Sequence, residues 1–77
     1  MFNARYFRTF ITLVETGSFT RTARRLEMTQ PGVSQHLRKL EVYLGKPLLD
    51  RQARRFVLTE SGRRVYDYAL KLFAEHE

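Results

Sequence analysis

The sequence predicts a mainly α-helical domain, and three observations support this class. Apolar residues recur at helical spacing in four segments that glycine or proline separates. One of these segments, residues 29–40, combines an apolar stripe with an opposite face of amide, hydroxyl and guanidinium groups. Thirteen of the 14 lysines and arginines precede residue 65, where only five acidic residues oppose them. Such a basic segment favours a polyanionic partner, with a solvated basic surface as the alternative.

The length of 77 residues and the net charge of +6 restrict the class of protein. The chain is long enough for one small domain, and without cysteine its stability must come from packing or from a partner chain. The lack of cysteine fits the cytosol. There is no run of about 18 apolar residues and no signal peptide, so no spanning helix is expected. No membrane partner is expected either, because the arginines are spread over several predicted elements and do not line one amphipathic helix.

The first two helices are predicted at residues 4–16 and 19–26. Asn3 and Ser18 are expected to cap them, because their side chains accept hydrogen bonds from free backbone N–H groups. Gly17 can take the positive φ that ends the first helix. The expected inward residues are Tyr6, Phe7, Phe10, Ile11, Leu13 and Val14 in the first helix and Phe19, Ala23 and Leu26 in the second.

The third helix is predicted at about residues 30–44. Thr29 or Gln30 is expected to cap it, Pro31 falls in its first turn, and Gly45 ends it. The spacing predicts an inward stripe of Val33, Leu37, Leu40 and Leu44 and an outward set of Gln30, Ser34, Gln35 and Arg38. A helix with such a polar face can lie in the DNA major groove, where amide and guanidinium groups contact base edges. The alternative is that the outward set consists of ordinary exposed polar residues.

Two short segments, 48–51 and 55–58, are predicted to pair as a two-stranded β-hairpin. Thr59 is expected to cap a last helix that runs from Glu60 to near the C-terminus, with Gly62 as a weak point in its first turn. The apolar band of this helix is wider than one core requires, which favours a helix–helix partner surface. The band comprises Val65, Tyr66, Ala69, Leu70, Leu72 and Phe73.

The order of helix, short helix, turn, third helix, basic hairpin and long helix is that of a winged helix-turn-helix domain. Particular residues narrow the class further: Gly17-Ser18-Phe19-Thr20, Ala23, Leu26, Thr29-Gln30-Pro31, Val33-Ser34, Leu40-Glu41, Leu44-Gly45 and Leu58-Thr59-Glu60 with Gly62. With these residues the sequence resembles, over essentially its whole length, the N-terminal DNA-binding domain of LysR-type transcriptional regulators. The resemblance implies sequence-specific binding of double-stranded DNA by a symmetric dimer that regulates transcription.

The resemblance also implies that the third helix enters the major groove. In the family, the residues matching Gln30, Pro31 and Ser34 approach base edges or phosphates. The position of Gln35 is commonly arginine, which contacts guanine, whereas a glutamine suits adenine. Gly32 stands where a larger residue is common, so an apolar contact with a thymine methyl is absent. The predicted base-reading residues are Gln30, Pro31, Ser34, Gln35 and Arg38.

The wing and the helix ends supply two further groups of predicted contacts. The wing arginine that matches Arg54 is the family's minor-groove probe, and inserted arginine favours a narrow, A·T-rich groove. The predicted wing contacts are Arg51, Arg54 and Arg55. Helix caps place backbone amides where a phosphate can meet them. The predicted phosphate contacts are Ser18, Thr22, Thr29 and Lys39.

The last helix of family members pairs with its counterpart across a dimer. The residues that match this role are Val65, Tyr66, Ala69, Leu70 and Phe73. We therefore expect residues 1–58 to form the DNA-binding domain and residues 59–77 to form the linker and dimerisation helix. Family members also carry an effector-binding domain of two α/β lobes, which is absent from this chain.

We therefore expect a fragment without a cofactor, and any small-molecule effector is expected to bind the missing domain. The expected partners are an operator with an inverted repeat and a second copy of the chain. The full-length protein is expected to act as a dimer or a tetramer in the bacterial cytoplasm.

Two other classes of binding function remain open from the residues alone. One is a non-specific or RNA-directed basic module, although single-strand binding uses aromatic platforms and the aromatic residues here fall on core stripes. The other is a dimerisation module whose charge serves solubility. An enzyme or a metal site is not expected, because the sequence has no glycine-rich phosphate loop, no nucleophile–base pair and no cluster of metal ligands.

Overall fold

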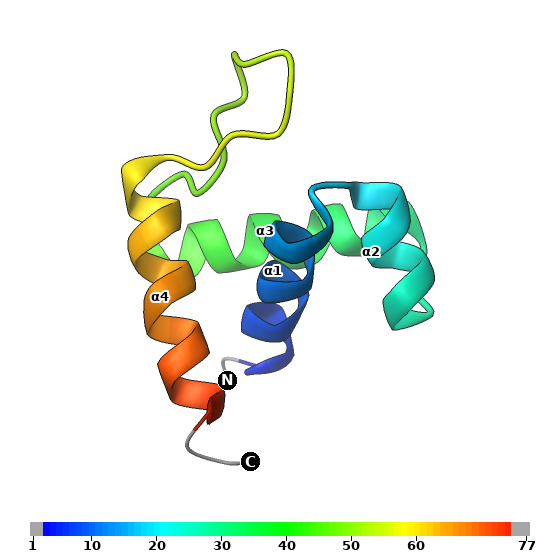
Figure 1. Cartoon of the computed structure of the whole chain (residues 1–77), viewed down its shortest axis with the longest axis horizontal. Helices are drawn as coiled ribbons and strands as arrows, with labels where there is room; N and C mark the ends of the chain where they lie inside the picture. The colour runs from blue at the N-terminus through cyan, green and yellow to red at the C-terminus, as the bar shows by residue number, and fades with distance from the viewer. Residues whose placement is uncertain (1–2, 75–77) are drawn as a thin grey trace.

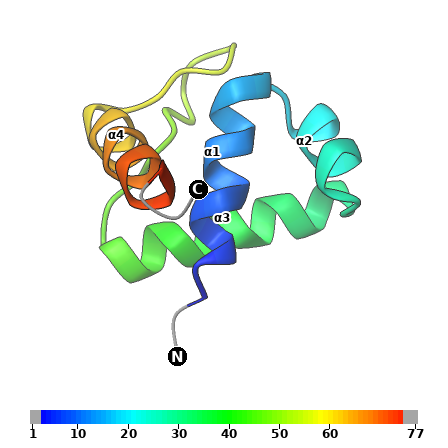
Figure 2. The same cartoon turned by 60° about the horizontal axis from the view of Figure 1, so that its bottom comes forward.

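The computed structural model describes residues 3–74, which form four helices in the expected order. These are α1 (Arg5–Thr16), α2 (Phe19–Leu26), α3 (Gln30–Leu44) and α4 (Glu60–Ala74). The views in Figures 1 and 2 agree that α1 crosses the middle of α3, with α2 near one end of α3 and α4 near the other. None of the helices in these residues is long and apolar enough to cross a membrane.

The core lies where α1 crosses α3, and it confirms the predicted apolar stripes. Phe10 and Leu13 of α1 are completely buried, as are Val33 and Leu40 of α3. Leu37 of α3 is 1% exposed. Burying a side chain of this size stabilises the fold by about 1.5–3 kcal/mol. The partly buried residues that pack against this core include Ile11, Val14, Phe19, Met28 and Leu44.

Ser18 and Thr29 cap their helices as predicted, whereas the predicted cap by Asn3 is wrong by one residue. The Asn3 side chain accepts a hydrogen bond from the Arg5 N–H at 2.8 Å, but the helix begins one residue later than expected and Ala4 holds the cap position. Ser18 caps α2, and Thr29 caps α3. These caps stabilise each helix by about 1 kcal/mol.

The turn between α2 and α3 is closed by backbone in the left-handed region. Glu27 has φ 57°, and it is the one non-glycine residue with positive φ among residues 3–74. The Met28 N–H donates to the Ala23 carbonyl at 2.8 Å, which completes the end of α2. Met28 then packs, partly buried, against the core and fixes the turn from below.

The wing lies between α3 and α4 and projects beyond the helices (Figure 1). Its base is antiparallel: Leu49 and Leu58 form a bridge, and the Asp50 N–H donates to the Val57 carbonyl at 2.9 Å. The two predicted segments thus pair in the expected antiparallel sense, and within the described residues the bridge is an isolated one. The loop lacks an Asn-Gly or Asp-Gly turn, and two isolated strands are marginal in water. Burial of Leu48 and Leu49 anchors the wing instead.

Gly62 corrects an expectation about the first turn of α4. Thr59 caps this helix as predicted, because its Oγ1 accepts the Gly62 N–H at 2.9 Å. Gly62 itself is buried, and a Cβ there would collide with the carbonyl oxygen of Leu48 and lie 3.0 Å from the carbonyl carbon. The residue is therefore no weak point, because only glycine lets α4 approach the base of the wing this closely.

The apolar band of α4 faces mainly inward. Ala69 has no exposed surface, so the prediction that it contacts a partner chain is wrong. Val65, Tyr66 and Phe73 are half-buried against the protein's own core, and the Phe73 ring lies 4.9 Å from the guanidinium carbon of Arg8. The band is wide because α4 has to cover α1. The apolar side chains that α4 exposes most are Tyr68, at 59%, and Leu70, at 39%.

Candidate nucleic-acid interface

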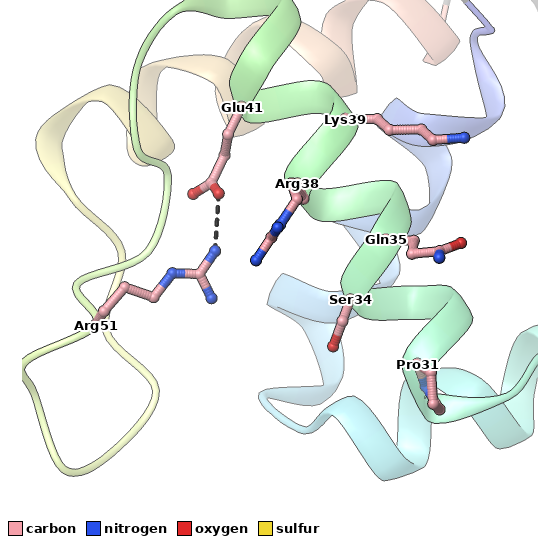
Figure 3. Close-up of a pocket in the computed structure, with 7 residues that line it drawn as sticks. All are labelled: Pro31, Ser34, Gln35, Arg38, Lys39, Glu41 and Arg51. Carbon is pink, nitrogen blue, oxygen red and sulfur yellow. Dashed lines mark hydrogen bonds and ion pairs between the residues drawn. The ribbon is translucent and has the colours of Figure 1, made fainter.

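The outer face of α3 carries the predicted base-reading residues together. Burial of the stripe along its opposite side turns Gln30, Pro31, Ser34, Gln35 and Arg38 to the solvent, and all five are exposed. Figure 3 shows Pro31, Ser34 and Arg38 following one another along the helix at the edge of a groove. The groove is lined by Pro31, Ser34, Gln35, Arg38, Lys39, Glu41 and Arg51. The structure thus brings hydroxyl, amide and guanidinium groups to a single open surface.

Gln30 is tied to α2 by its side chain. Its Nε2 donates to the Thr20 hydroxyl oxygen at 3.1 Å, and both residues are exposed. This bond joins the first residue of α3 to the first turn of α2 and orients the amide before any ligand arrives. Thr20 received no role from the sequence. The sequence indicates the importance of Thr20 only in that Thr20 belongs to a segment that carries the family resemblance.

Glu41 is the second residue to which the sequence assigned no role. Its Oε1 accepts a hydrogen bond from Nη2 of Arg51 at 2.7 Å, and its Oε2 accepts the Leu48 N–H at 2.7 Å. Figure 3 shows the pair bridging α3 and the wing, with the Arg38 side chain directed toward the same space. The sequence does contain one indication of a role for Glu41: it is an acidic residue in the basic segment, close to the outward polar residues of α3.

The three predicted wing arginines separate into two groups. Arg54 and Arg55 are exposed in the wing loop, beyond a turn in which the Asp50 side chain accepts the Gln52 N–H at 3.0 Å. Arg51 is also exposed, but its guanidinium is held at Glu41, beside α3. The wing therefore presents two arginines in its loop and a third at its junction with α3.

Of the predicted phosphate contacts, Ser18 and Thr29 serve as helix caps, whereas Thr22 is buried. Ser18 and Thr29 use their hydroxyl oxygens as helix caps, at 3.1 Å from the backbone nitrogens of Arg21 and Gly32 respectively. Thr22 has no exposed surface, and its hydroxyl lies 2.8 Å from the Thr16 hydroxyl. A phosphate cannot reach that hydroxyl, so the prediction of a contact by the Thr22 side chain is corrected.

Lys39 and His36 lie on the side of α3 that meets α1. The Lys39 ammonium is exposed and lies 5.9 Å from the centre of the Tyr6 ring. His36 is half-buried, with Nδ1 2.8 Å from the Thr9 hydroxyl oxygen. Burial lowers the pKa of His36, and the nearby cations of Arg5 and Lys39 lower it further. His36 therefore acts as a neutral link between α1 and α3.

Comparison with known proteins places this geometry among bacterial regulators. The family model "Bacterial regulatory helix-turn-helix protein, lysR family" matches residues 4–63. The regulator YxjO of Bacillus subtilis (strain 168) is 44% identical over 68 residues, which are 88% of this chain and 23% of YxjO. The regulator BudR of Klebsiella aerogenes is 40% identical over 70 residues, which are 91% of this chain and 49% of BudR.

The fold agrees with a solved structure of a regulator domain on DNA. The DNA-binding domain of BenM in complex with catB site 1 DNA superposes with a TM-score of 0.89 at 38% identity. The matched region covers 96% of this chain and 83% of that one. The chain spans less than half the length of the two curated relatives above.

Proposed function

Because the chain belongs to the LysR family of bacterial helix-turn-helix regulators, we propose that it binds double-stranded DNA sequence-specifically and regulates transcription. In this proposal α3 enters the major groove and the wing contacts the minor groove. The observation that carries the proposal is the exposed polar face of α3 beside the basic groove and the wing. The DNA complex of the BenM domain supports it, because that domain shares this fold over nearly the whole chain.

The base contacts are proposed to come from the first turns of α3. Gln35 is exposed and free to project from the helix, and an amide there suits adenine, to which it can donate and from which it can accept. Gln30 is held by Thr20 and offers its remaining amide groups to a neighbouring base pair. Arg38 makes no ion pair within residues 3–74, so its guanidinium is available to guanine or to phosphate. Each bidentate base contact supplies about 1–3 kcal/mol of discrimination.

Arg54 and Arg55 are proposed to follow the minor groove from the wing. Both are exposed on a loop anchored by buried leucines at its base, so the loop can project without loss of core packing. Arginine in a narrow minor groove benefits from the stronger negative potential of A·T-rich sequence. We therefore propose an operator with A·T-rich segments beside the bases that α3 contacts.

A dimer through α4 is proposed to double this interface on an inverted repeat. The large apolar side chains that α4 exposes are Tyr68 and Leu70, whereas Val65, Tyr66 and Phe73 are partly buried. Two-fold symmetry of the protein would match half-sites about one helical turn, or a multiple of it, apart. A tetramer, a small-molecule effector and a second domain that binds it are proposed for the whole cytoplasmic protein.

Selection from a random duplex library followed by titration tests the proposed function. We expect enrichment of an inverted repeat and tighter binding to it than to random duplex. Ser34→Ala and Gln35→Ala should each reduce that discrimination by about 1–3 kcal/mol, or roughly five- to 150-fold. Ser61→Ala, in the first turn of α4 and outside the groove, is the matched control and should leave discrimination unchanged. Equal affinity for all duplexes, or preference for single-stranded RNA, would overturn the proposal.

A further inference from the structure

We infer that Glu41 is a positioning residue for DNA binding, which holds Arg51 beside α3 as a fixed contact for a backbone phosphate. This inference rests on the proposed function, since it needs duplex DNA on the α3 face. It assigns a purpose to an acidic side chain that lies on the edge of the DNA-facing groove, where a negative charge alone would oppose binding.

The carboxylate of Glu41 has both oxygens engaged. Oε2 accepts the Leu48 N–H and Oε1 accepts from Arg51, each at 2.7 Å. The Glu41 side chain is 14% exposed, whereas the Arg51 side chain is 57% exposed. The partly buried carboxylate is therefore a fixed anchor, and the more exposed guanidinium is the group that it orients.

The backbone of Glu41 belongs to the same junction. Its carbonyl oxygen accepts the N–H groups of Gly45 and Lys46, at 2.8 and 3.2 Å, where α3 ends. One residue thus joins the recognition helix, the chain that leaves it and the base of the wing. Loss of the Glu41–Arg51 pair would free the Arg51 side chain without removing any predicted DNA contact.

The position of Arg51 favours phosphate over a base in the minor groove. A guanidinium has five N–H donors, and the ion pair with Glu41 uses one nitrogen. The remaining donors face the groove into which Arg38 points (Figure 3). Two guanidinium groups beside one carboxylate leave a net positive charge there. An arginine tethered at α3 is also drawn away from the wing tip, where Arg54 lies.

Electrostatics and positioning predict opposite signs for the removal of this carboxylate. If Glu41 acted only through its charge, Glu41→Gln would strengthen DNA binding, because one repulsion of the phosphates would disappear. If Glu41 positions Arg51, the same change weakens binding, because a mobile arginine loses more conformational freedom when it contacts DNA. The neutral amide retains an oxygen for the Leu48 N–H, so the turn at the wing base is preserved.

The experiment is a titration of the full chain with its selected operator duplex and with random duplex, over a range of salt concentrations. We expect Glu41→Gln and Arg51→Ala each to weaken binding to both duplexes equally, by about three- to tenfold. For Arg51→Ala the slope of log affinity against log salt concentration should also become less steep by about 1, the contribution of one phosphate contact. In the Arg51→Ala background Glu41→Gln should no longer weaken binding, because no arginine is left to position and only the relief of phosphate repulsion remains. Equal loss on both duplexes marks a phosphate contact.

Matched variants separate positioning from charge and from folding. Glu60→Gln removes an exposed carboxylate that also pairs with an arginine, and it should not weaken binding. Glu41→Asp keeps the charge but shortens the side chain, so it should weaken binding as Glu41→Gln does. Thermal unfolding of each free variant checks the fold, and Arg51→Ala breaks the pair from the other side if Glu41→Gln does not fold.

Tighter or unchanged binding by Glu41→Gln, or independent effects of the two substitutions, would overturn the inference and leave the proposed function intact. If the unsubstituted protein shows no preference for duplex DNA, the proposed function itself fails and the inference fails with it.

Discussion

Gly62 lies against the Leu48 carbonyl so closely that no side chain fits between the first turn of α4 and the base of the wing. The contact joins two segments on either side of the wing loop. It also lies next to the Thr59 N–H, which donates to the same carbonyl at 3.0 Å. The angle at which α4 leaves the DNA-binding surface is thus set by the absence of a Cβ.

Gly62→Ala should destabilise the protein, although alanine is the better helix former by about 1 kcal/mol. The new methyl group must displace backbone rather than a flexible side chain, at a cost of about 1–3 kcal/mol. Urea unfolding measures the change, with Ser61→Ala as the control one residue earlier. A Gly62→Ala protein at least as stable as the unsubstituted one would show that α4 can shift freely.

Glu27→Gly should stabilise the protein. Glu27 ends α2 at φ 57°, a conformation that costs an L-residue about 1 kcal/mol and glycine almost nothing. Glu27 is exposed and enters no ion pair among residues 3–74, so the substitution removes little else. We expect a higher midpoint of urea unfolding, by an amount equivalent to roughly 1 kcal/mol. The control is Gly45→Ala, at φ 73°, which should lose stability by the same argument.

The stability of the protein should fall as the pH drops below about 6.5, the usual pKa of histidine. Burial, and then Arg5 and Lys39, lower the pKa of His36 in the folded state, so the unfolded chain binds a proton first. The stabilisation is complete above the unfolded pKa and is lost as the pH falls toward the folded pKa. Tm should decline from pH 8 to pH 5, and this decline should be smaller for His36→Gln than for the unsubstituted protein. An unchanged profile would show that His36 is not responsible.

Thr22→Val should reduce stability without altering the contribution of phosphate contacts. The valine keeps the shape of the buried side chain but removes the 2.8 Å hydrogen bond to the Thr16 hydroxyl, which keeps its bonds to the Ser18 backbone, so the loss is about 0.5–1.5 kcal/mol. The salt slope of DNA binding should stay the same, because the Thr22 hydroxyl has no exposed surface. A flatter slope would restore the original prediction of a phosphate contact at Thr22. Lys39→Ala is the comparison, since that exposed cation should flatten the slope.

The family of this chain, its four helices and the polar face of α3 could all be predicted from the sequence. These features depend on local physics. Apolar residues at a helical period bury one side of each helix, and Ser18, Thr29, Thr59 and Gly45 cap or end the helices through atoms within a few residues. Because the apolar stripe of α3 is buried, the polar side chains on its opposite side face the solvent.

Only the tertiary structure decided which residues of each pattern remain accessible and which are joined. The pairing of Glu41 with Arg51, the burial of Thr22 and Ala69, and the close contact of Gly62 with Leu48 all depend on neighbours from other elements. A periodic pattern identifies the apolar side of α4, but it does not say whether that side meets α1 or a second chain. Likewise it shows that arginines lie in the wing, but not that one of them turns back to a carboxylate on α3. Sequence spacing specifies contacts along one helix, whereas contacts between elements exist only once the chain has packed.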